Sequence, residues 1–352
     1  MQTALIIATV LAVAATLLPL SRSDAWWVRG FDFPRLQILV LLALVAVAWA
    51  VMPGGGEGPS WLRPVLGLSL AACAAHQLWM MYPYLPFARP QVQRSRGGDP
   101  RSSLSMLTAN VLMTNRDAAR LLGIVRDADP DVILLVETDD WWHEQLGVLR
   151  QSHPFAVEQP QDNTYGMLLY SRLPLIEPKV EFLVQPDIPS IHVGVQLRSG
   201  VRVELHCMHP RPPFPTEDDS STGRDAELLI VGKGIKERSE PVVVMGDLND
   251  VAWSRTNYLF QDISGLLDPR IGRGFYNTFH AQLPFLRFPL DHFFHSNHFR
   301  LIDFRRLPAF GSDHFPVFIA LSCEASAPAQ QPQLHADGQE RQEAERKIDK
   351  AR

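Results

Sequence analysis

Polar side chains of the kinds that do chemistry follow directly after short apolar runs at several places in the chain. The set comprises Asn110, Glu137, His209, Asp247 with Asn249, Asp291, and Asp313 with His314. One such residue alone is usually a solvated loop residue, a cap or a hydrogen-bonded structural group. Their repeated appearance at strand ends instead indicates functional groups that a rigid scaffold holds on its loops.

The stretch VVVMGDLND, residues 242–250, shows this pattern most clearly. Its first four residues are apolar and mostly β-branched, which predicts a short buried strand. Gly246 ends the run and allows a sharp exit of the backbone. Asp247 and Asn249 follow at once, so the strand end would hold a proton acceptor and an amide at one edge of a sheet.

Three of these side chains offer oxygen ligands for a metal: Asn110, Glu137 and Asp313. Carboxylate and amide oxygens suit a hard cation such as Mg2+ or Mn2+. The sequence has neither a CxxC pair nor an HExxH motif, which would indicate zinc. We therefore expect Mg2+ or Mn2+ as the cofactor.

The other side chains suit proton transfer and the stabilisation of negative charge. Asp291 could hold His314 through one ring nitrogen and favour its charged form. Asp247 could accept a proton from water, and Asn249 could orient the phosphate or the nucleophile. A metal, an imidazolium and amide donors around one oxyanion are what phosphoester hydrolysis requires.

Alternating strand and helix signals between residues 103 and 323 must position these groups. SLSMLTANV, DVILLVET and VRVELHCMHP predict strands, RDAARLLGIVRDADP predicts a helix, and Ser199-Gly200 predicts a hairpin turn. Hairpins mixed with strand-helix-strand units indicate an α/β fold with layers around sheets, rather than a purely parallel sheet. The sequence has no GxGxxG or GxxxxGKS loop to indicate a nucleotide-binding fold.

Seven motifs together resemble those of the endonuclease/exonuclease/phosphatase superfamily, the DNase I-like fold. In chain order they are TANV, VILLVET, YGMLLYSRLPL, HCMHPRPP, GDLNDVAWS, RFPLDHFFHS and FGSDHFPV. The resemblance covers residues 103–323 and implies a four-layer αββα sandwich, in which two packed mixed β-sheets are flanked by helices. It also implies a metal-dependent phosphoesterase that hydrolyses a phosphodiester or phosphomonoester by in-line attack of activated water.

The resemblance implies roles for individual residues. Glu137 is the principal metal ligand, and Asn110 and Asp313 complete the metal and phosphate environment. His209 contacts the phosphate. Tyr165 falls near the place where some members have a phosphate-contacting tyrosine, so it is a candidate for substrate binding.

The same resemblance implies the catalytic residues. Asp247 acts as the base or positions the nucleophile, and Asn249 supports it. Asp291 orients His314, which stabilises the pentacovalent charge. Arg224, in GRDAELL, is a further candidate for substrate binding, although an Arg on a helix face is usually a solvated charge.

Residues 1–86 contain three long apolar runs, at 5–20, 36–52 and 65–85. A bilayer core requires about 20 apolar residues, so the runs predict three transmembrane helices. Trp and Tyr residues gather at their ends, as is typical of membrane interfaces. The first run lacks a basic n-region and a small-x-small site, so we expect an anchor rather than a cleaved signal peptide.

Arginines outside the apolar runs set the expected orientation. Three lie between the first two runs, Arg63 alone lies between the second and third, and Arg89, Arg94, Arg96 and Arg101 follow the third. The positive-inside rule then places the N-terminus outside and the catalytic region in the cytoplasm, in a multi-pass protein of the cell membrane. The periplasm stays the alternative, because long domains can be exported despite nearby charge.

Two polar segments flank the region of strands and helices. Residues 87–102 are rich in Pro, Gly, Arg and Ser, which predicts a linker. Residues 324–352 are rich in Pro and Gln and then mixed in charge, which predicts a disordered tail. The expected organisation is a membrane region at 1–86, the linker, a catalytic domain at 103–323 and the tail.

The charge of the catalytic region bears on its substrate. Residues 101–323 contain 21 Lys and Arg against 28 Asp and Glu, a difference of −7. A sequence-nonspecific duplex binder usually has a basic surface. We therefore expect a phospholipid headgroup, an inositol phosphate or another small phosphodiester, with membrane lipids as partners and no protein partner indicated.

Three alternatives stay open. A nuclease on DNA or RNA is one, since net charge does not reveal the potential of a cleft; His292 stands where many nuclease members have Tyr, which counts against nuclease-like chemistry. A catalytically silent, membrane-anchored binding protein is another, yet Glu137, Asp247 and His314 are all present. A transporter would need polar residues inside the apolar runs, and His76 is the only clear one.

Overall fold

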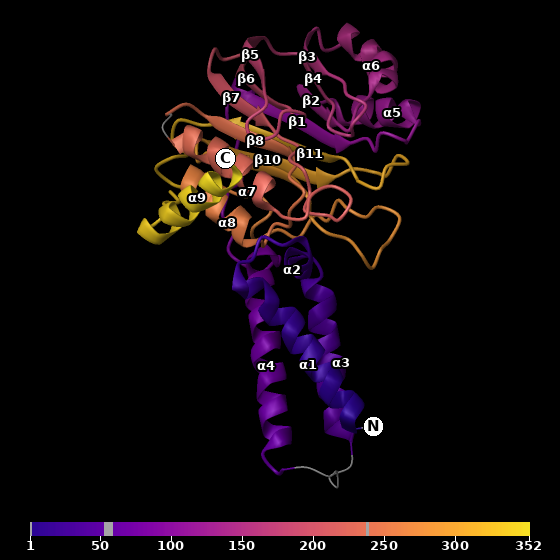
Figure 1. Cartoon of the computed structure of the whole chain (residues 1–352). Coiled ribbons are helices and arrows are strands. Elements are labelled where there is room, and N and C mark those ends of the chain that lie inside the picture. Colours follow the sequence, from indigo (N-terminus) through magenta and orange to yellow (C-terminus); the bar gives the residue numbers. More distant parts are fainter. Residues whose placement is uncertain (1, 53–58, 237–238) are drawn as a thin grey trace.

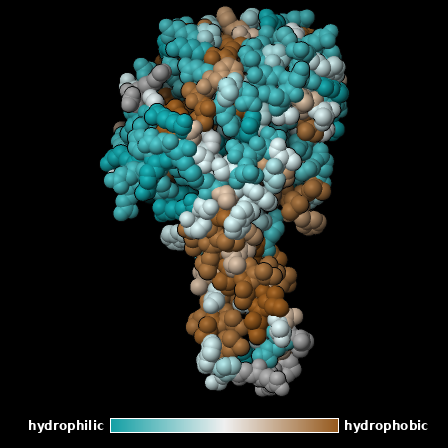
Figure 2. Space-filling model, in the orientation of Figure 1, coloured by the Kyte–Doolittle hydropathy of each residue, from teal (hydrophilic) through white to brown (hydrophobic). Residues whose placement is uncertain are grey.

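The computed structural model describes residues 2–52, 59–236 and 239–352 as a helical stalk that carries a larger α/β domain (Figure 1). The stalk contains α1 (Gln2–Leu17), α3 (Arg35–Val51) and α4 (Leu62–Met81). These helices pack through a narrow apolar seam that includes Ala12 and Leu42. Most of the remaining apolar surface of the stalk faces outward, as the brown colour in Figure 2 shows.

Two helical segments of the stalk are long and apolar enough to cross a bilayer, Gln2–Ser21 and Leu62–Tyr84. Trp26–Asp32 and Arg35–Val51 form a pair bent by 74°, and the number of candidate spans rises to three if this pair is counted as one. The three apolar runs of the sequence thus lie in α1, α3 and α4, and the second is a span only together with the short segment before it.

Two mixed β-sheets form the centre of the α/β domain. The first has the strand order β10-β11-β1-β2-β4-β3 and the second β5-β6-β7-β8-β9. The strands of the first are β1 (Ser103–Asn110), β2 (Val132–Val136), β3 (Phe155–Gln159), β4 (Met167–Ser171), β10 (Phe299–Arg306) and β11 (Val317–Cys323). Those of the second are β5 (Leu175–Glu181), β6 (Ser190–Gln196), β7 (Arg202–Cys207), β8 (Val242–Asp247) and β9 (Asp291–His295). Each sheet has one parallel pair, β1 with β2 and β7 with β8.

Helices cover the outer faces of both sheets. α5 (Ala118–Ala128) and α6 (Asp140–Leu146) cover the first sheet, and α7 (Thr222–Lys236), α8 (Arg255–Ser264) and α9 (Gly338–Ala351) lie on the side of the second. Between the sheets, apolar side chains of both inner faces form one buried cluster. The predicted fold of two packed mixed sheets flanked by helices is confirmed.

Shorter helical pieces connect these elements. They are α2 (Trp26–Arg29) and the 3-10 turns η1 (Leu18–Ser21), η2 (Gly30–Asp32), η3 (Tyr82–Tyr84), η4 (Pro100–Ser102) and η5 (Gly147–Gln151).

The C-terminal tail differs from the expected disorder, because residues 338–351 form helix α9. Asp337 and Glu340 make a capping box at its start. Ala344 and Ile348 are buried against α7 and α8. The polar composition of this segment predicted disorder because it does not reveal the surface of α7 and α8 against which these two apolar residues pack.

Ion pairs tie α9 to the top of the stalk. Lys347 Nζ lies 2.7 Å from Asp24 Oδ1 and 2.8 Å from Asp225 Oδ2 of α7. Arg22 NH1 lies 3.1 Å from Glu343 Oε2. The last helix of the chain therefore joins the α/β domain to the segment between α1 and α2.

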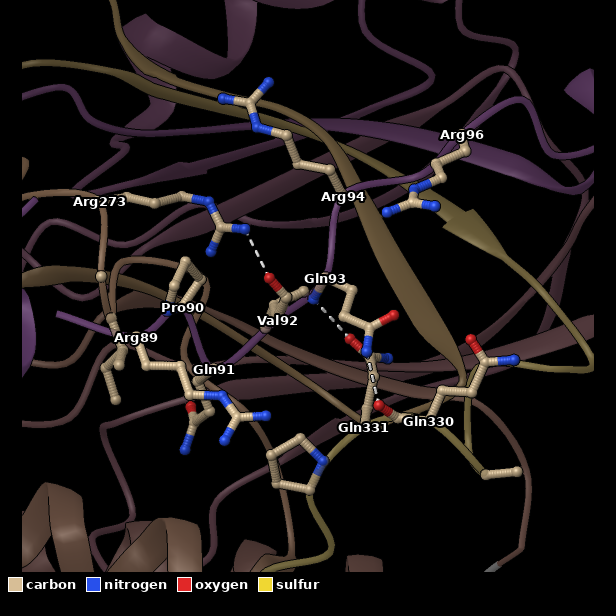
Figure 3. Close-up of a pocket in the computed structure, with 14 residues that line it drawn as sticks. Arg89, Pro90, Gln91, Val92, Gln93, Arg94, Arg96, Arg273, Gln330 and Gln331 are labelled. Carbon is tan, nitrogen blue, oxygen red and sulfur yellow. Dashed lines mark hydrogen bonds between the residues drawn. The ribbon is translucent and has the colours of Figure 1, made fainter. Parts of the chain in front are cut away.

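The segment 87–102, expected as a linker, lies along the edge of the first sheet. Gln93 and Ser95 exchange backbone hydrogen bonds with Leu301 of β10, and Val92 is fully buried. A cavity of about 1080 Å3 lies between this segment and residues 271–273 and 329–332. Figure 3 shows it lined with arginines and glutamines, and it contains none of the predicted catalytic acids.

Candidate active site

The predicted metal ligands and catalytic residues lie where strands of both sheets end. Asn110 is the last residue of β1, and Glu137 follows β2, the parallel neighbour of β1. Asp247 ends β8 opposite Asp291, which begins the antiparallel β9. Because the sheets pack face to face, one side-chain contact bridges them: Asn110 Nδ2 donates to Asp247 Oδ2 at 3.1 Å.

Asn110 also connects the first sheet to its own acidic residue. Its Nδ2 donates to Glu137 Oε1 at 2.6 Å, and the backbone N–H of Met113 donates to Glu137 Oε2 at 3.3 Å. Burial raises the pKa of Glu137 to about 7, and the negative charges of Asp247 and Asp313 add to that rise. Glu137 has a φ of 63°, a left-handed backbone conformation that residues other than glycine adopt infrequently.

The oxygen atoms around Glu137 fit a hard divalent cation. Glu137 and Asp313 provide carboxylate oxygens, the donors such cations prefer. The Asn110 oxygen, by contrast, accepts a hydrogen bond from the backbone N–H of Leu112 at 2.9 Å. A bound cation would also favour the ionised form of Glu137, which burial and neighbouring carboxylates disfavour here.

A second group of potential ligands has a different chemistry. Asp247, Asp291 and His314 place one ligand atom each within 4.8 Å of one another. Although burial alone would lower the pKa of His314, the charges of Asp291 and Asp247 raise it to about 10. A protonated imidazole has no free lone pair for a metal, so this group is better described as a charged hydrogen-bonding unit.

The geometry of that unit fixes the direction of the His314 ring. His314 Nδ1 lies 2.8 Å from Asp291 Oδ2, and its Nε2 lies 3.5 Å from Asp247 Oδ2. Burial lowers the pKa of His209 to about 4, so this ring is neutral near pH 7. His209 Nε2 lies 3.9 Å from Asp247 Oδ2. The structure thus surrounds Asp247 with one charged and one neutral imidazole.

Asp247 ends β8 at this centre, and the turn that follows holds it there. Gly246 has a φ of 141°, and a Cβ at this position would lie 2.0 Å from the carbonyl oxygen of Met208. Only glycine fits such a close approach. The backbone N–H of Asn249 donates to Asp247 Oδ1 at 3.0 Å, and its Nδ2 donates to Pro210 O at 3.0 Å. Asn249 therefore supports the turn and holds Asp247.

Arg224, a predicted substrate contact, lies on the inner side of the same turn, and the prediction is corrected here. Its side chain is fully buried and donates through NH1 to Asn249 O at 2.7 Å. Its NH2 lies 2.9 Å from Asp225 Oδ1 and 3.3 Å from Asp250 Oδ2. A guanidinium that two carboxylates hold in the interior positions the turn and does not reach a substrate.

Tyr165 lies at the rim of the centre. Its ring centroid is 5.3 Å from that of His209, and its hydroxyl donates to Glu217 Oε2 at 2.7 Å. The Arg211 guanidinium carbon lies 5.4 Å from the Tyr165 ring centroid. Arg211 was not predicted, although it stands two residues after His209 in HCMHPRPP.

Two further residues support the centre and were also not predicted. Ser312 Oγ donates to Asn110 O at 2.8 Å and accepts a hydrogen bond from the backbone N–H of His314 at 3.0 Å. The ring centroid of Phe279 lies 5.0 Å from that of His314. Ser312 lies inside the motif FGSDHFPV, whereas nothing in the sequence around Phe279 indicates this contact.

Comparison with known proteins bears directly on this geometry. Residues 107–314 match the model of the endonuclease/exonuclease/phosphatase family. The chain belongs to this family. The matched segment runs from within β1 to His314, so it contains every residue of the centre described above.

Solved structures confirm the fold of this family. A structure of endonuclease/exonuclease/phosphatase from Beutenbergia cavernae is similar, with a TM-score of 0.52, 19% identity and coverage of 64% of this chain and 72% of that one. The structure of D. rerio TDP2 complexed with single-strand DNA product has a TM-score of 0.51 and 19% identity, and the match covers 63% of this chain and 99% of that one. The structure of the human Nocturnin catalytic domain with bound sulfate anion has a TM-score of 0.51 and 16% identity, and the match covers 64% of this chain and 96% of that one. No curated protein matches the chain in sequence.

All three activities in the family name act on phosphoester bonds, so the chain is an enzyme that hydrolyses phosphoric esters. Enzymes of the endonuclease/exonuclease/phosphatase family use a divalent metal, and the oxygen-rich surroundings of Glu137 are consistent with one.

Proposed function

We propose that the chain is a membrane-anchored, divalent-metal-dependent phosphoesterase that hydrolyses a phosphodiester or phosphomonoester by in-line attack of water. One observation carries this proposal: Asn110 hydrogen-bonds both Glu137 and Asp247, and Asp247 faces the pair of Asp291 and His314. Oxygen ligands, a buried carboxylate and an imidazolium thereby surround one point at the strand ends.

Within this arrangement each side chain has its own part. Asp247 accepts the proton of the attacking water, since burial raises its pKa and makes it a better proton acceptor. His314, which Asp291 keeps protonated, donates a hydrogen bond from Nε2 to the phosphoryl oxygen as negative charge develops. His209 contacts the phosphate as a neutral ring.

Mg2+ or Mn2+ is the proposed cofactor. Glu137 is its proposed principal ligand, and Asn110 and Asp313 complete its surroundings. When bound, such a cation polarises the phosphoryl oxygen and stabilises negative charge in the transition state.

The helices of the stalk support the proposal that the chain is anchored in a membrane. Its two candidate spans, or three with the bent pair, expose apolar side chains along their length. Arg89, Arg94 and Arg96 follow the last span and are exposed on the α/β domain. By the positive-inside rule we place the N-terminus outside and the α/β domain in the cytoplasm, as in a bacterial membrane-tethered member of the family.

Hydrolysis by the full chain in detergent or in nanodiscs tests this proposal. Bis-p-nitrophenyl phosphate, plasmid DNA and phospholipid vesicles would be assayed with Mg2+, with Mn2+ and with EDTA. Metal-dependent turnover that is lost in both His314→Ala and Asp247→Asn is expected. A folded protein whose turnover is the same as that of the two variants would indicate a catalytically silent binding protein, and cleavage of DNA alone would indicate a nuclease.

A further inference from the structure

A loop beside the catalytic centre exposes an apolar tip next to the stalk. In residues 283–286, Phe285 is 88% exposed, Leu283 47% and Leu286 48%. Gln37 Nε2 of α3 donates to Phe285 O at 2.6 Å, which ties this tip to the stalk. In Figure 1 the loop is part of the orange segment that hangs towards the upper end of the stalk helices, and Figure 2 shows a separate brown patch on that side. Large exposed apolar side chains grouped in this way mark a contact surface.

An apolar groove of about 630 Å3 runs between this loop and the stalk. Its walls include Leu36 and Val40 of α3, Met81 of α4, and Phe275, Phe285 and Phe288. A groove of this size lies within the range of about 300–1,000 Å3 that ligand pockets occupy. Because α3 and α4 contribute to its walls, the groove is continuous with the apolar surface that the stalk presents to a bilayer.

The groove contains two arginines without an acidic partner. Arg287 and Arg306 line it and lie over the ring of Phe315, with guanidinium carbons 5.0 and 4.2 Å from the ring centroid. Among the described residues neither forms an ion pair; each donates only to a backbone carbonyl, at 3.0 and 2.8 Å. Two neighbouring cations without a carboxylate form a site for an anionic group.

The loop that carries the apolar tip is packed on the catalytic motif. The backbone N–H of Ala281 donates to Asp313 O at 2.6 Å, and that of Phe315 donates to Thr278 O at 2.9 Å. Phe279 packs against His314. The groove, the two arginines and the catalytic centre therefore adjoin one another along a single segment of the chain.

We propose that the substrate is an anionic phospholipid, whose acyl chain lies in the groove while Arg287 and Arg306 bind the negative charge of its headgroup region. This inference rests on the proposed phosphoesterase function. Hydrolysis consumes one water: its oxygen bonds to phosphorus and gives up one proton to Asp247, the bond from phosphorus to the leaving oxygen breaks, and that oxygen takes up one proton and departs as an alcohol. A lipid reaches the centre sideways from the bilayer, without leaving it entirely.

Matched substitutions on α3 and β10 test the groove. Val40→Trp fills it, whereas Val47→Trp adds the same ring two turns further along α3, at an exposed position outside the groove. Arg306→Gln removes one unpaired cation, whereas Arg305→Gln removes an exposed arginine that lies 3.2 Å from Asp303. The measurement is the ratio of turnover on phosphatidylglycerol vesicles to turnover on bis-p-nitrophenyl phosphate, with the full chain in nanodiscs.

We expect Val40→Trp and Arg306→Gln to lower this ratio by about tenfold or more, and the two control variants to keep it within about twofold. Unchanged ratios in the first pair, with metal-dependent turnover of the soluble diester intact, would overturn the lipid inference and leave the phosphoesterase standing. Wild-type turnover of DNA without turnover of phosphatidylglycerol would overturn it as well.

Lipid binding can be measured without catalysis. In the Asp247→Asn variant, a phosphatidylglycerol that carries a photoreactive diazirine in its acyl chain should label peptides from residues 275–288. Val40→Trp should remove that labelling and Val47→Trp should not. Labelling without turnover of any substrate by the wild type would refute the phosphoesterase but support the groove as a lipid site, and the absence of labelling would refute the groove.

Discussion

Two clusters of buried charge lie on opposite sides of one turn, and their charge balance differs. Asp247 ends β8 at the catalytic centre, and the turn after β8 places Asp250 in a cluster behind it. In that rear cluster, Asp225 and Asp250 are paired with Arg224, Arg29 and Lys347. The catalytic centre instead holds the carboxylates of Glu137, Asp247, Asp291 and Asp313 around one charged imidazole, that of His314.

This difference in charge balance distinguishes the residues that stabilise the turn after β8 from the residues of the catalytic centre. Balanced buried charges stabilise one conformation when each has its partners. An excess of buried carboxylates raises the pKa values of those carboxyl groups, as at Glu137. Their mutual repulsion is relieved by protons, a bound cation or a positively charged substrate group. Buried charge alone therefore does not mark the site in this molecule; unbalanced buried charge does.

The largest expected effect concerns the catalytic side of the comparison. His314→Ala should lower kcat by about a hundred- to ten-thousandfold, because it removes the charged donor at the phosphoryl oxygen. The melting temperature of the variant should stay close to that of the wild type, although its rate falls. Stopped assays with bis-p-nitrophenyl phosphate and thermal unfolding of the same samples measure both. A variant that loses stability and activity together would show that this centre is also structural.

The next effect concerns the rear cluster. Arg224→Met leaves Asp225 and Asp250 buried with one cation fewer, which should lower the free energy of unfolding by about 3–5 kcal/mol. Thermal denaturation followed by circular dichroism measures this loss. Arg120→Met, at an exposed helix position, is the matched control. If Arg224→Met unfolds like the wild type yet loses turnover, the assignment of this cluster to support is wrong.

Metal binding should have a smaller effect on the stability of the folded protein. Saturating Mg2+, at about a hundred times its dissociation constant, should stabilise the folded protein by about 2.7 kcal/mol. Glu137→Gln should remove most of this gain, whereas Arg224→Lys should keep it. Melting curves recorded with Mg2+ and with EDTA give the comparison. Equal gains in the wild type and Glu137→Gln would place the cation elsewhere.

The smallest effect is one of pH. Burial alone would raise the pKa of Asp225, but Lys347, Arg224 and Arg29 hold it well below its usual range. The stabilisation from this carboxylate is therefore present above its ordinary pKa, near 3.8, and is lost as the pH falls below that value. The difference in melting temperature between wild type and Asp225→Asn should shrink as the pH falls from 6 towards 3, about the ordinary range of carboxyl titration. A difference that grows towards low pH would contradict this sign.

The sequence was informative where chemistry and local pattern coincide. A β-branched run that ends in Gly-Asp predicts both the strand β8 and the acid at its end. Motif order predicted the two packed sheets, and the strand ends that carry Asn110, Glu137, Asp247 and Asp291 meet as expected.

What the sequence did not predict depends on packing between distant segments. Arg224 stands on a helix whose pattern gives no sign that its guanidinium turns inward to Asp250, because that contact depends on the position of the turn after β8. Helix α9 depends on a surface formed by α7 and α8. The groove beside Phe285 depends on the seating of the domain on the stalk, which no local pattern specifies.

The ion pairs between α9 and the top of the stalk have a consequence for biosynthesis. Lys347 and Glu343 belong to α9, which follows every other described element, and they hold Asp24 and Arg22, which lie between α1 and α2. Domains form during translation in the order of their synthesis, so the stalk helices are made long before α9 exists. The ion pairs of α9 can therefore form only after every other described element has been made, whereas contacts such as that of Trp253 Nε1 with Asp32 O, at 2.7 Å, need only earlier parts of the chain.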